Sequence, residues 1–189
     1  MDSKLSTSQK QTLLALARES IRYGLEHGTV MPVPPERYDA ELQKSGACFV
    51  TLTLAAELRG CIGSLEAYRP LVVDVAHNAY AAAFSDPRFA PLSRAELAQI
   101  KTEISVLNPA EEISANSEAA LLAQLRPGID GLILQEGQRR GTFLPSVWQQ
   151  LPTAAQFLTH LKLKAGLPAN YWSDTLRFFR YTTTQFGEE

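Results

Sequence analysis

The chain is poor in the residues that mark metal centres and disulfide-bonded folds. Only two of its 189 residues are cysteines, Cys48 and Cys61, and neither belongs to the C-x-x-C pair of a structural zinc site. Two cysteines favour free thiols in a reducing cytoplasm over a disulfide. The three histidines, His27, His77 and His160, are scattered, and no H-E-x-x-H motif occurs. We therefore expect no metal site.

Other features are also absent. Lys and Arg number 18 against 20 Asp and Glu, so the formal net charge is −2 and nucleic-acid binding is not expected. No apolar run approaches the roughly 18 residues of a membrane span, and residues 1–7 do not lead into the apolar core of a signal peptide. No P-loop and no G-x-G-x-x-G motif is present. These absences predict a cytoplasmic protein that does not enter membranes.

The remaining composition is that of an ordinary globular chain. Hydrophobic residues make up 45% and charged residues 20% of the sequence, enough for a proper core. The length suits one large domain or two small subdomains. Because no repeat, low-complexity tract or linker interrupts it, we expect a single domain over residues 1–189.

Apolar periodicity predicts an alternation of hairpins and helices. Helices are expected at 9–26, 70–84, 92–97, 118–125 and 154–164. Strands are expected at 48–54, 58–63, 102–107, 132–134, 141–144 and 175–185, with a loop at 111–117. Strands that come in hairpins with helices between them indicate an α+β fold with antiparallel sheet.

The stretch Leu58-Arg59-Gly60-Cys61-Ile62-Gly63 is the strongest local candidate for a site. It reads as the second strand of a hairpin, and side chains two apart on a strand share a face. Arg59 would then lie beside Cys61, where a guanidinium favours the thiolate form of a thiol. The two glycines leave room for a ligand or for another backbone.

Each of these features also has a purely structural interpretation. Free cysteine is often a small buried residue, so Cys61 is either a reactive thiol or part of the packing. A Cys-His pair needs a nearby histidine, and only His77 lies on the helix that follows the motif. Asp86 and Arg88 flank a proline, where they either pair with each other or act on a substrate.

Several segments together resemble the AMMECR-type domain, also known as AmmeMemoRadiSam system protein A. They are LRGCIG at 58–63, NAYAAAFSDPRF at 78–89, EISVL at 103–107, PGIDGLIL at 127–134, GTFLPSVWQQLP at 141–152 and KAGL at 164–167. The resemblance spans about residues 48–172. It implies a compact α+β protein of two unequal subdomains with a cleft between them, and LRGCIG at or near that cleft. It also implies a genomic association with a Memo-like protein and a radical SAM enzyme, but no established reaction or cofactor.

Two functions are compatible with these observations. In the first, the chain is an enzyme or the catalytic accessory of one, with Cys61 and Arg59 as catalytic residues. The substrate would be bound by six further residues: Gly60, Ile62, Gly63, Asn78, Asp86 and Arg88. In the second, the same surface is a non-catalytic binding or adaptor module for a protein partner, with Arg59 as its anchor. The sequence assigns neither a cofactor nor an oligomeric state.

Overall fold

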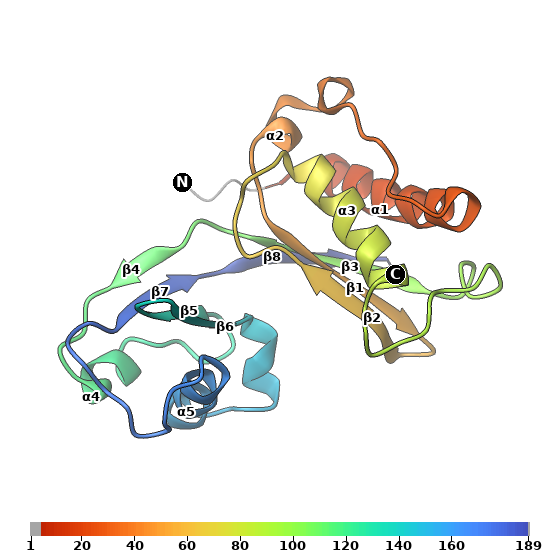
Figure 1. The fold of residues 1–189 in the computed structure, drawn as a ribbon. Helices are drawn as coiled ribbons and strands as arrows, with labels where there is room; N and C mark the ends of the chain where they lie inside the picture. Colours follow the sequence, from red (N-terminus) through yellow and green to blue (C-terminus); the bar gives the residue numbers. More distant parts are fainter. Residues whose placement is uncertain (1–4, 189) are drawn as a thin grey trace. The chain divides into compact units, whose positions relative to one another are not determined.

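The computed structural model describes residues 5–188, which fold into two compact units (Figure 1). Among the described residues, the large unit comprises 5–107 together with 184–188, and the small unit comprises 108–183. The chain therefore passes from the large unit to the small one and back. Each unit has its own sheet and its own hydrophobic core. The mixture of helices with antiparallel sheet confirms the predicted α+β class.

The large unit is a four-stranded sheet in the order β2-β1-β3-β8 with two long helices on one face (Figure 1). Its helices are α1 (Thr7–His27), α2 (Ala40–Gln43) and α3 (Leu71–Phe84), with a 3-10 turn η1 (Pro35–Arg37). Its strands are β1 (Cys48–Leu54), β2 (Glu57–Gly63), β3 (Lys101–Leu107) and β8 (Thr183–Gly187).

The ends of α1 follow from local chemistry. Ser6 accepts from the Gln9 backbone N–H at 3.2 Å, and the Gln9 side chain accepts from the Ser6 N–H at 2.8 Å, so the first turn has a capping box. Gly28 ends the helix in the left-handed region at φ 70°. At Gly24 an added Cβ would lie 2.5 Å from Phe84, so glycine lets α1 pack closely against α3.

The β1–β2 hairpin contains a β-bulge. Ala55 and Ala56 form the turn, both with positive φ (51° and 66°), as a two-residue hairpin turn requires. Leu52 pairs with Gly60 but Thr53 pairs with Leu58, which leaves one extra residue, Arg59, on β2. The bulge breaks the simple alternation of faces along β2.

The small unit is a second antiparallel sheet, in the order β4-β7-β5-β6. Its strands are β4 (Glu111–Ile113), β5 (Gly131–Glu136), β6 (Arg139–Phe143) and β7 (Arg177–Tyr181). Its helices are α4 (Glu118–Leu122), η2 (Pro145–Gln149) and α5 (Ala154–Lys164). Trp148 and Phe157 stack in its core with ring centroids 3.9 Å apart.

Three elements differ from the sequence expectation. The segment expected as one strand at 175–185 is two strands, β7 and β8, which belong to different sheets. The polar segment at 111–117, expected as a loop, begins with the edge strand β4, where Glu112 pairs with Phe179 of β7. Residues 92–97, expected as a helix, contain no helix, and turns occupy residues 94–99 instead. Glu96 nevertheless accepts from the Ser93 backbone N–H at 2.8 Å, as in a helix cap.

Candidate functional site

Cys61 lies on the sheet face opposite α1 and α3. It pairs with Thr51 of β1, whose hydroxyl donates to the Cys61 Sγ at 3.3 Å. The neighbours Val50 and Leu52 are fully buried on the helix side. Cys48 also faces the helices, so the two free cysteines occupy opposite faces of the sheet. The Cys61 thiol is half-buried, whereas Cys48 is fully buried.

The turn after α3 is hydrogen-bonded to the edge of β2 at Cys61. Asp86 Oδ2 accepts from the Cys61 backbone N–H at 2.9 Å, and the two Asp86 oxygens take Arg88 Nε and Nη2 at 3.0 and 2.7 Å. Arg88 Nη2 also reaches the Cys61 carbonyl at 3.5 Å. Hydrogen bonds thus bring together Cys61, Asp86 and Arg88, three residues that the sequence analysis proposed as site candidates.

Asp86 is held as an anion. Its side chain is 2% exposed, while that of Arg88 is 54% exposed. The Arg88 hydrogen bonds hold the pKa of the Asp86 carboxyl well below its usual range, against the effect of burial, and the Cys61 and Arg88 backbone N–H groups add to this. A carboxylate so fully engaged orients its neighbours and does not serve as a general base near neutral pH.

Arg59 is paired with a carboxylate and not with the thiol. Its Nε and Nη2 donate to Glu96 at 2.7 and 3.2 Å, which holds the pKa of Glu96 at about 2. The physical reason for this departure is the bulge, which takes Arg59 out of the alternation that would set it beside Cys61. Arg88 lies beside Cys61 instead, with its Nη2 at 3.5 Å from the Cys61 carbonyl oxygen.

One donor of Arg59 is unused. Its Nη1 is buried and has no hydrogen-bond partner among the described residues, whereas the guanidinium lies 5.9 Å from the centre of the Phe89 ring. Arg88 lies 5.4 Å from the same ring. Phe89 is therefore the common neighbour of both guanidinium groups.

The motif glycines and Ile62 have packing roles. A Cβ on Gly60 would lie 2.0 Å from the Ala82 carbonyl oxygen of α3, and one on Gly63 would lie 2.2 Å from the Phe49 ring. Both glycines admit neighbouring protein atoms and leave no room at the Cβ position for a ligand. Ile62 packs against the core between the sheet and the helices.

Asn78 belongs to a separate buried cluster. Its amide donates to Ser64 Oγ at 3.1 Å and to Asp74 Oδ2 at 3.0 Å, and Asp74 also accepts from Arg69 at 2.7 Å. Asp74 and Asn78 are both buried, so Asn78, which the sequence proposed as a substrate-binding residue, serves this internal cluster. The cluster connects α3 to the first residue of β1: Asp74 accepts a hydrogen bond from the Cys48 N–H at 2.9 Å.

Sequence reasoning missed Thr51 and the pairing role of Glu96. The hairpin register alone would not have identified Thr51 as the partner of Cys61. A regular hairpin that turns at Ala55-Ala56 pairs Thr51 with Gly60, and only the bulge shifts the pairing to Cys61. Glu96 lies 37 residues from Arg59 in the sequence, and no motif at either position identifies the other as its partner.

The described residues supply no obvious metal or histidine chemistry at this site. They contain no group of three or more His, Cys, Asp or Glu side chains placed to hold a metal ion. His77 is exposed on α3. Partial desolvation of its ring, and next the positive charge of Arg69, lower its pKa. Within the same residues, none of the helices has the length and apolar character needed to cross a bilayer.

Comparison with known proteins fits this arrangement. A family model described as AMMECR1 matches residues 14–186. The chain belongs to the AMMECR1 family. This AMMECR1-family chain is 36% identical over 187 residues to a protein from Methanothermobacter thermautotrophicus, covering 98% of this chain and 97% of that protein. It is 36% identical over 199 residues to Protein MK0488 of Methanopyrus kandleri, covering 100% and 93%.

A solved structure gives the same fold. The crystal structure of the uncharacterized protein PH0010 from Pyrococcus horikoshii matches with a TM-score of 0.84 and 34% sequence identity. The match covers 94% of this AMMECR1-family chain and 90% of PH0010. The arrangement of helices and two antiparallel sheets is thus shared with a relative.

Proposed function

We propose that this AMMECR1-family chain uses Cys61 as a reactive thiol, as an enzyme or as the catalytic accessory of one. The observation that carries the proposal is the convergence of Thr51 and Arg88 on Cys61. The Thr51 hydroxyl donates to the Cys61 sulfur at 3.3 Å, and the half-exposed Arg88 guanidinium lies 3.5 Å from the Cys61 carbonyl oxygen. A hydrogen-bond donor and a cation near a partly exposed thiol are features of reactive cysteines. Asp86 fixes the Cys61 backbone and Arg88 at once.

In this proposal Arg59 has a different task from Arg88. Glu96 holds two of its donors, and the third nitrogen, Nη1, is buried without a partner among the described residues, so Arg59 fixes the segment around Glu96 beside β2. Asp86 and Arg88 orient the site, while Gly60, Ile62 and Gly63 shape the strand that carries it.

The reactivity of Cys61 tests the proposal directly. Native protein would be treated with iodoacetamide at pH 7, and the alkylation of each cysteine would be followed by mass spectrometry. Cys61 is expected to react in the folded state, whereas Cys48, whose pKa burial raises, serves as the protected internal control. Protection of Cys61 until the protein unfolds would refute the proposal.

Arg88→Gln should lower the Cys61 alkylation rate by about two- to fivefold, the range of a half-exposed charge pair. Arg88→Lys, which keeps the charge, should restore most of the rate. Arg94→Gln makes the same charge change at an exposed residue that lies before Glu96, and it should leave the rate unchanged. Equal rates in wild type and Arg88→Gln would remove Arg88 from the site.

The second candidate function is a non-catalytic adaptor. It is favoured by Asp86, which is too acidic to serve as a base, and by Arg59, since arginine is enriched at binding hot spots. The family resemblance directs this candidate to a Memo-like protein and a radical SAM enzyme in the cytoplasm. Purified partners from the same genome should bind wild type and Arg94→Ala equally, and should lose binding to Arg59→Ala. Equal binding by Arg59→Ala would count against the adaptor.

A further inference from the structure

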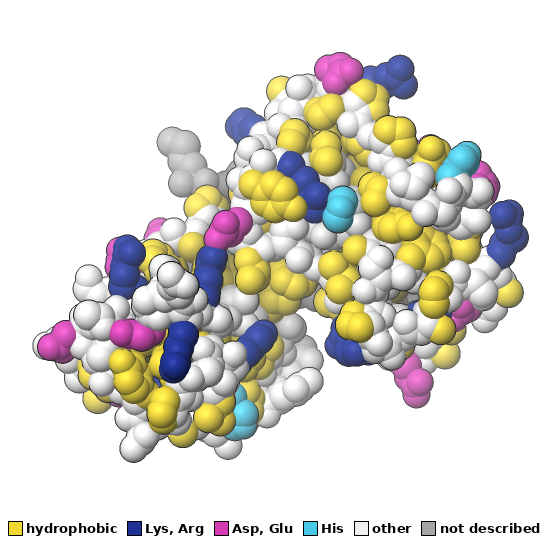
Figure 2. Space-filling view, viewed as in Figure 1, with side chains coloured by type: hydrophobic (Ala, Val, Ile, Leu, Met, Phe, Trp, Pro, Cys, Tyr) yellow, Lys and Arg dark blue, Asp and Glu magenta, His cyan; other side chains and the backbone are white. Residues whose placement is uncertain are grey.

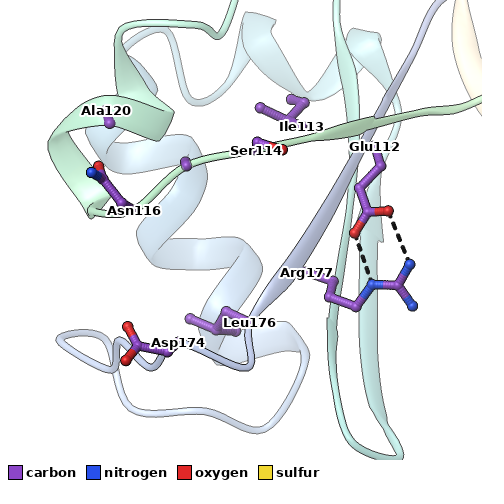
Figure 3. Close-up of a pocket in the computed structure, with 9 residues that line it drawn as sticks. Glu112, Ile113, Ser114, Asn116, Ala120, Asp174, Leu176 and Arg177 are labelled. Carbon is purple, nitrogen blue, oxygen red and sulfur yellow. Dashed lines mark hydrogen bonds and ion pairs between the residues drawn. The ribbon is translucent and has the colours of Figure 1, made fainter.

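A second candidate site lies wholly within the small unit, where β4 and β7 separate. The two strands pair only from Glu111 with Arg180 to Ile113 with Phe178. Beyond Ile113, the segment that leads to α4 and the segment that enters β7 diverge. They enclose a pocket of about 660 Å³ (Figure 3). This pocket is separate from the Cys61 site, which belongs to the large unit.

The pocket combines an apolar floor with two polar sides. Ile113 and Leu176 line it and are part of the small unit's core. Figure 3 shows the Glu112–Arg177 pair on one side of these residues, and Asp174 and Asn116 on the other.

The acidic groups of the pocket differ in how they are used. Arg177 donates to Glu112 through Nε at 2.8 Å and Nη2 at 3.0 Å, so these two charges neutralise each other. Asp174 and Asn116 are exposed, and neither makes a hydrogen bond or an ion pair within residues 5–188. The pocket therefore carries one uncompensated negative charge beside an apolar floor.

From this arrangement we infer that the pocket binds an alkylammonium group, with its apolar stem on Ile113 and Leu176 and its cationic end at Asp174. The carboxylate provides a charge-assisted acceptor, and the Asn116 amide oxygen is a second acceptor on the same side. A lysine side chain, which buries its methylene stem and keeps its ammonium in water, has this chemistry. A free organic amine has it too.

The overall charge of the protein does not explain cation binding at this pocket. Figure 2 shows Lys and Arg side chains interspersed with Asp and Glu over the visible face, and the net charge is only −2. A cationic ligand would accordingly be selected by the local pairing in the pocket rather than by a long-range field.

Binding can be measured by NMR titration of the full chain with n-pentylammonium, following the amide resonances of residues 112–116 and 174–177. We expect saturable shifts confined to these segments. n-Pentanol, which has the same stem without the charge, should bind about two- to fivefold more weakly. Raising the salt to 1 M should weaken pentylammonium binding, because the Debye length falls to about 3 Å. Equal binding of pentanol, or the absence of saturable shifts, would overturn the inference.

The matched variants are Asp174→Asn and Glu111→Gln. Asp174→Asn removes the free charge at constant shape and should weaken binding about two- to fivefold, the range of a solvent-exposed ion pair. Glu111→Gln makes the same charge change on β4 outside the pocket and should leave the affinity unchanged. Equal losses in both variants would show a general charge effect and would refute the site.

A second probe distinguishes the sources of the ammonium group. Nα-acetyl-lysine N-methylamide presents it from a peptide backbone, as a partner protein would. If it binds as tightly as pentylammonium, the pocket accepts a lysine of a protein. If only pentylammonium binds, the pocket accepts a free amine. Failure of both probes would overturn the inference and would leave the Cys61 proposal untouched, because the alkylation experiment has a separate readout.

Discussion

Gly60→Ala tests whether the motif glycine serves packing or ligand access. The added Cβ would lie 2.0 Å from the Ala82 carbonyl oxygen and 3.0 Å from its carbon. Real Cβ atoms essentially never come closer than 3.0 Å to another heavy atom, so β2 and α3 would have to separate by about 1 Å or more. Both atoms are backbone, so no side-chain rotation relieves the clash.

The same strand cannot move freely, because β1 pairs with it on one side and Asp86 holds Cys61 on the other. We expect Gly60→Ala to lower the free energy of unfolding by about 3 kcal/mol, an overpacking penalty only partly offset by the reduced entropy of the unfolded chain. Urea unfolding followed by circular dichroism measures this change.

Gly187→Ala is the matched control. Gly187 is exposed at the end of β8, and its added Cβ would approach the Thr102 carbonyl oxygen only to 3.3 Å. Its free energy of unfolding should change by less than about 1 kcal/mol, as is usual for surface sites. If Gly60→Ala is as stable as wild type, the packing explanation is refuted, and ligand access becomes the better reason for the glycine.

Three further perturbations follow from the large unit. Ala56→Gly should raise the free energy of unfolding by about 0.5–1 kcal/mol, because Ala56 has a φ of 66°, and a lower value in urea unfolding would contradict this. Asp74→Ala should lower it by about 3–5 kcal/mol, since Arg69 and the Cys48 N–H lose a buried acceptor, and a loss below about 1 kcal/mol would argue against the network. The pKa of Glu96 is lowered to about 2, so the ion pair with Arg59 stabilises the fold fully above pH 4.5 and loses this effect as the pH falls towards 2. We expect this loss to lower the free energy of unfolding by about 2 kcal/mol, after allowing for the partial exposure of the pair. Glu96→Gln should flatten acid unfolding over that window, and an unchanged profile would dismiss the ion pair.

The sequence predicted the regular elements well because their signals are local. The capping residues and apolar stripe of α1 and the alternation in β1 depend on neighbours a few positions away. The boundary between the two sheets was not predicted, since Thr182 joins β7 and β8 without any glycine or proline to mark the change. The polar strand β4 was also missed, because its pairing with β7 comes from more than 60 residues away.

The candidate site was predicted in its residue types but only partly in its contacts. Cys61, Asp86 and Arg88 do come together. The pairing of Arg59 with Glu96 could not be inferred, since one bulged residue reverses the assignment of faces and no local signal in the hairpin marks the bulge. Asn78, which was predicted to bind substrate at this site, is instead buried beside Asp74.

The Asp86–Arg88 clamp connects the fold to the proposed chemistry. β2 is an edge strand of its sheet, and an unpaired edge exposes backbone donors that invite association with other strands. Here the Cys61 N–H is bonded to a buried carboxylate, and the Cys61 carbonyl is within 3.5 Å of Arg88. Both backbone polar groups of Cys61 therefore have partners, while its thiol stays half-buried on the sheet face opposite the helices. This arrangement fixes the position of the sulfur without burying it, which a residue serving only the core would not require.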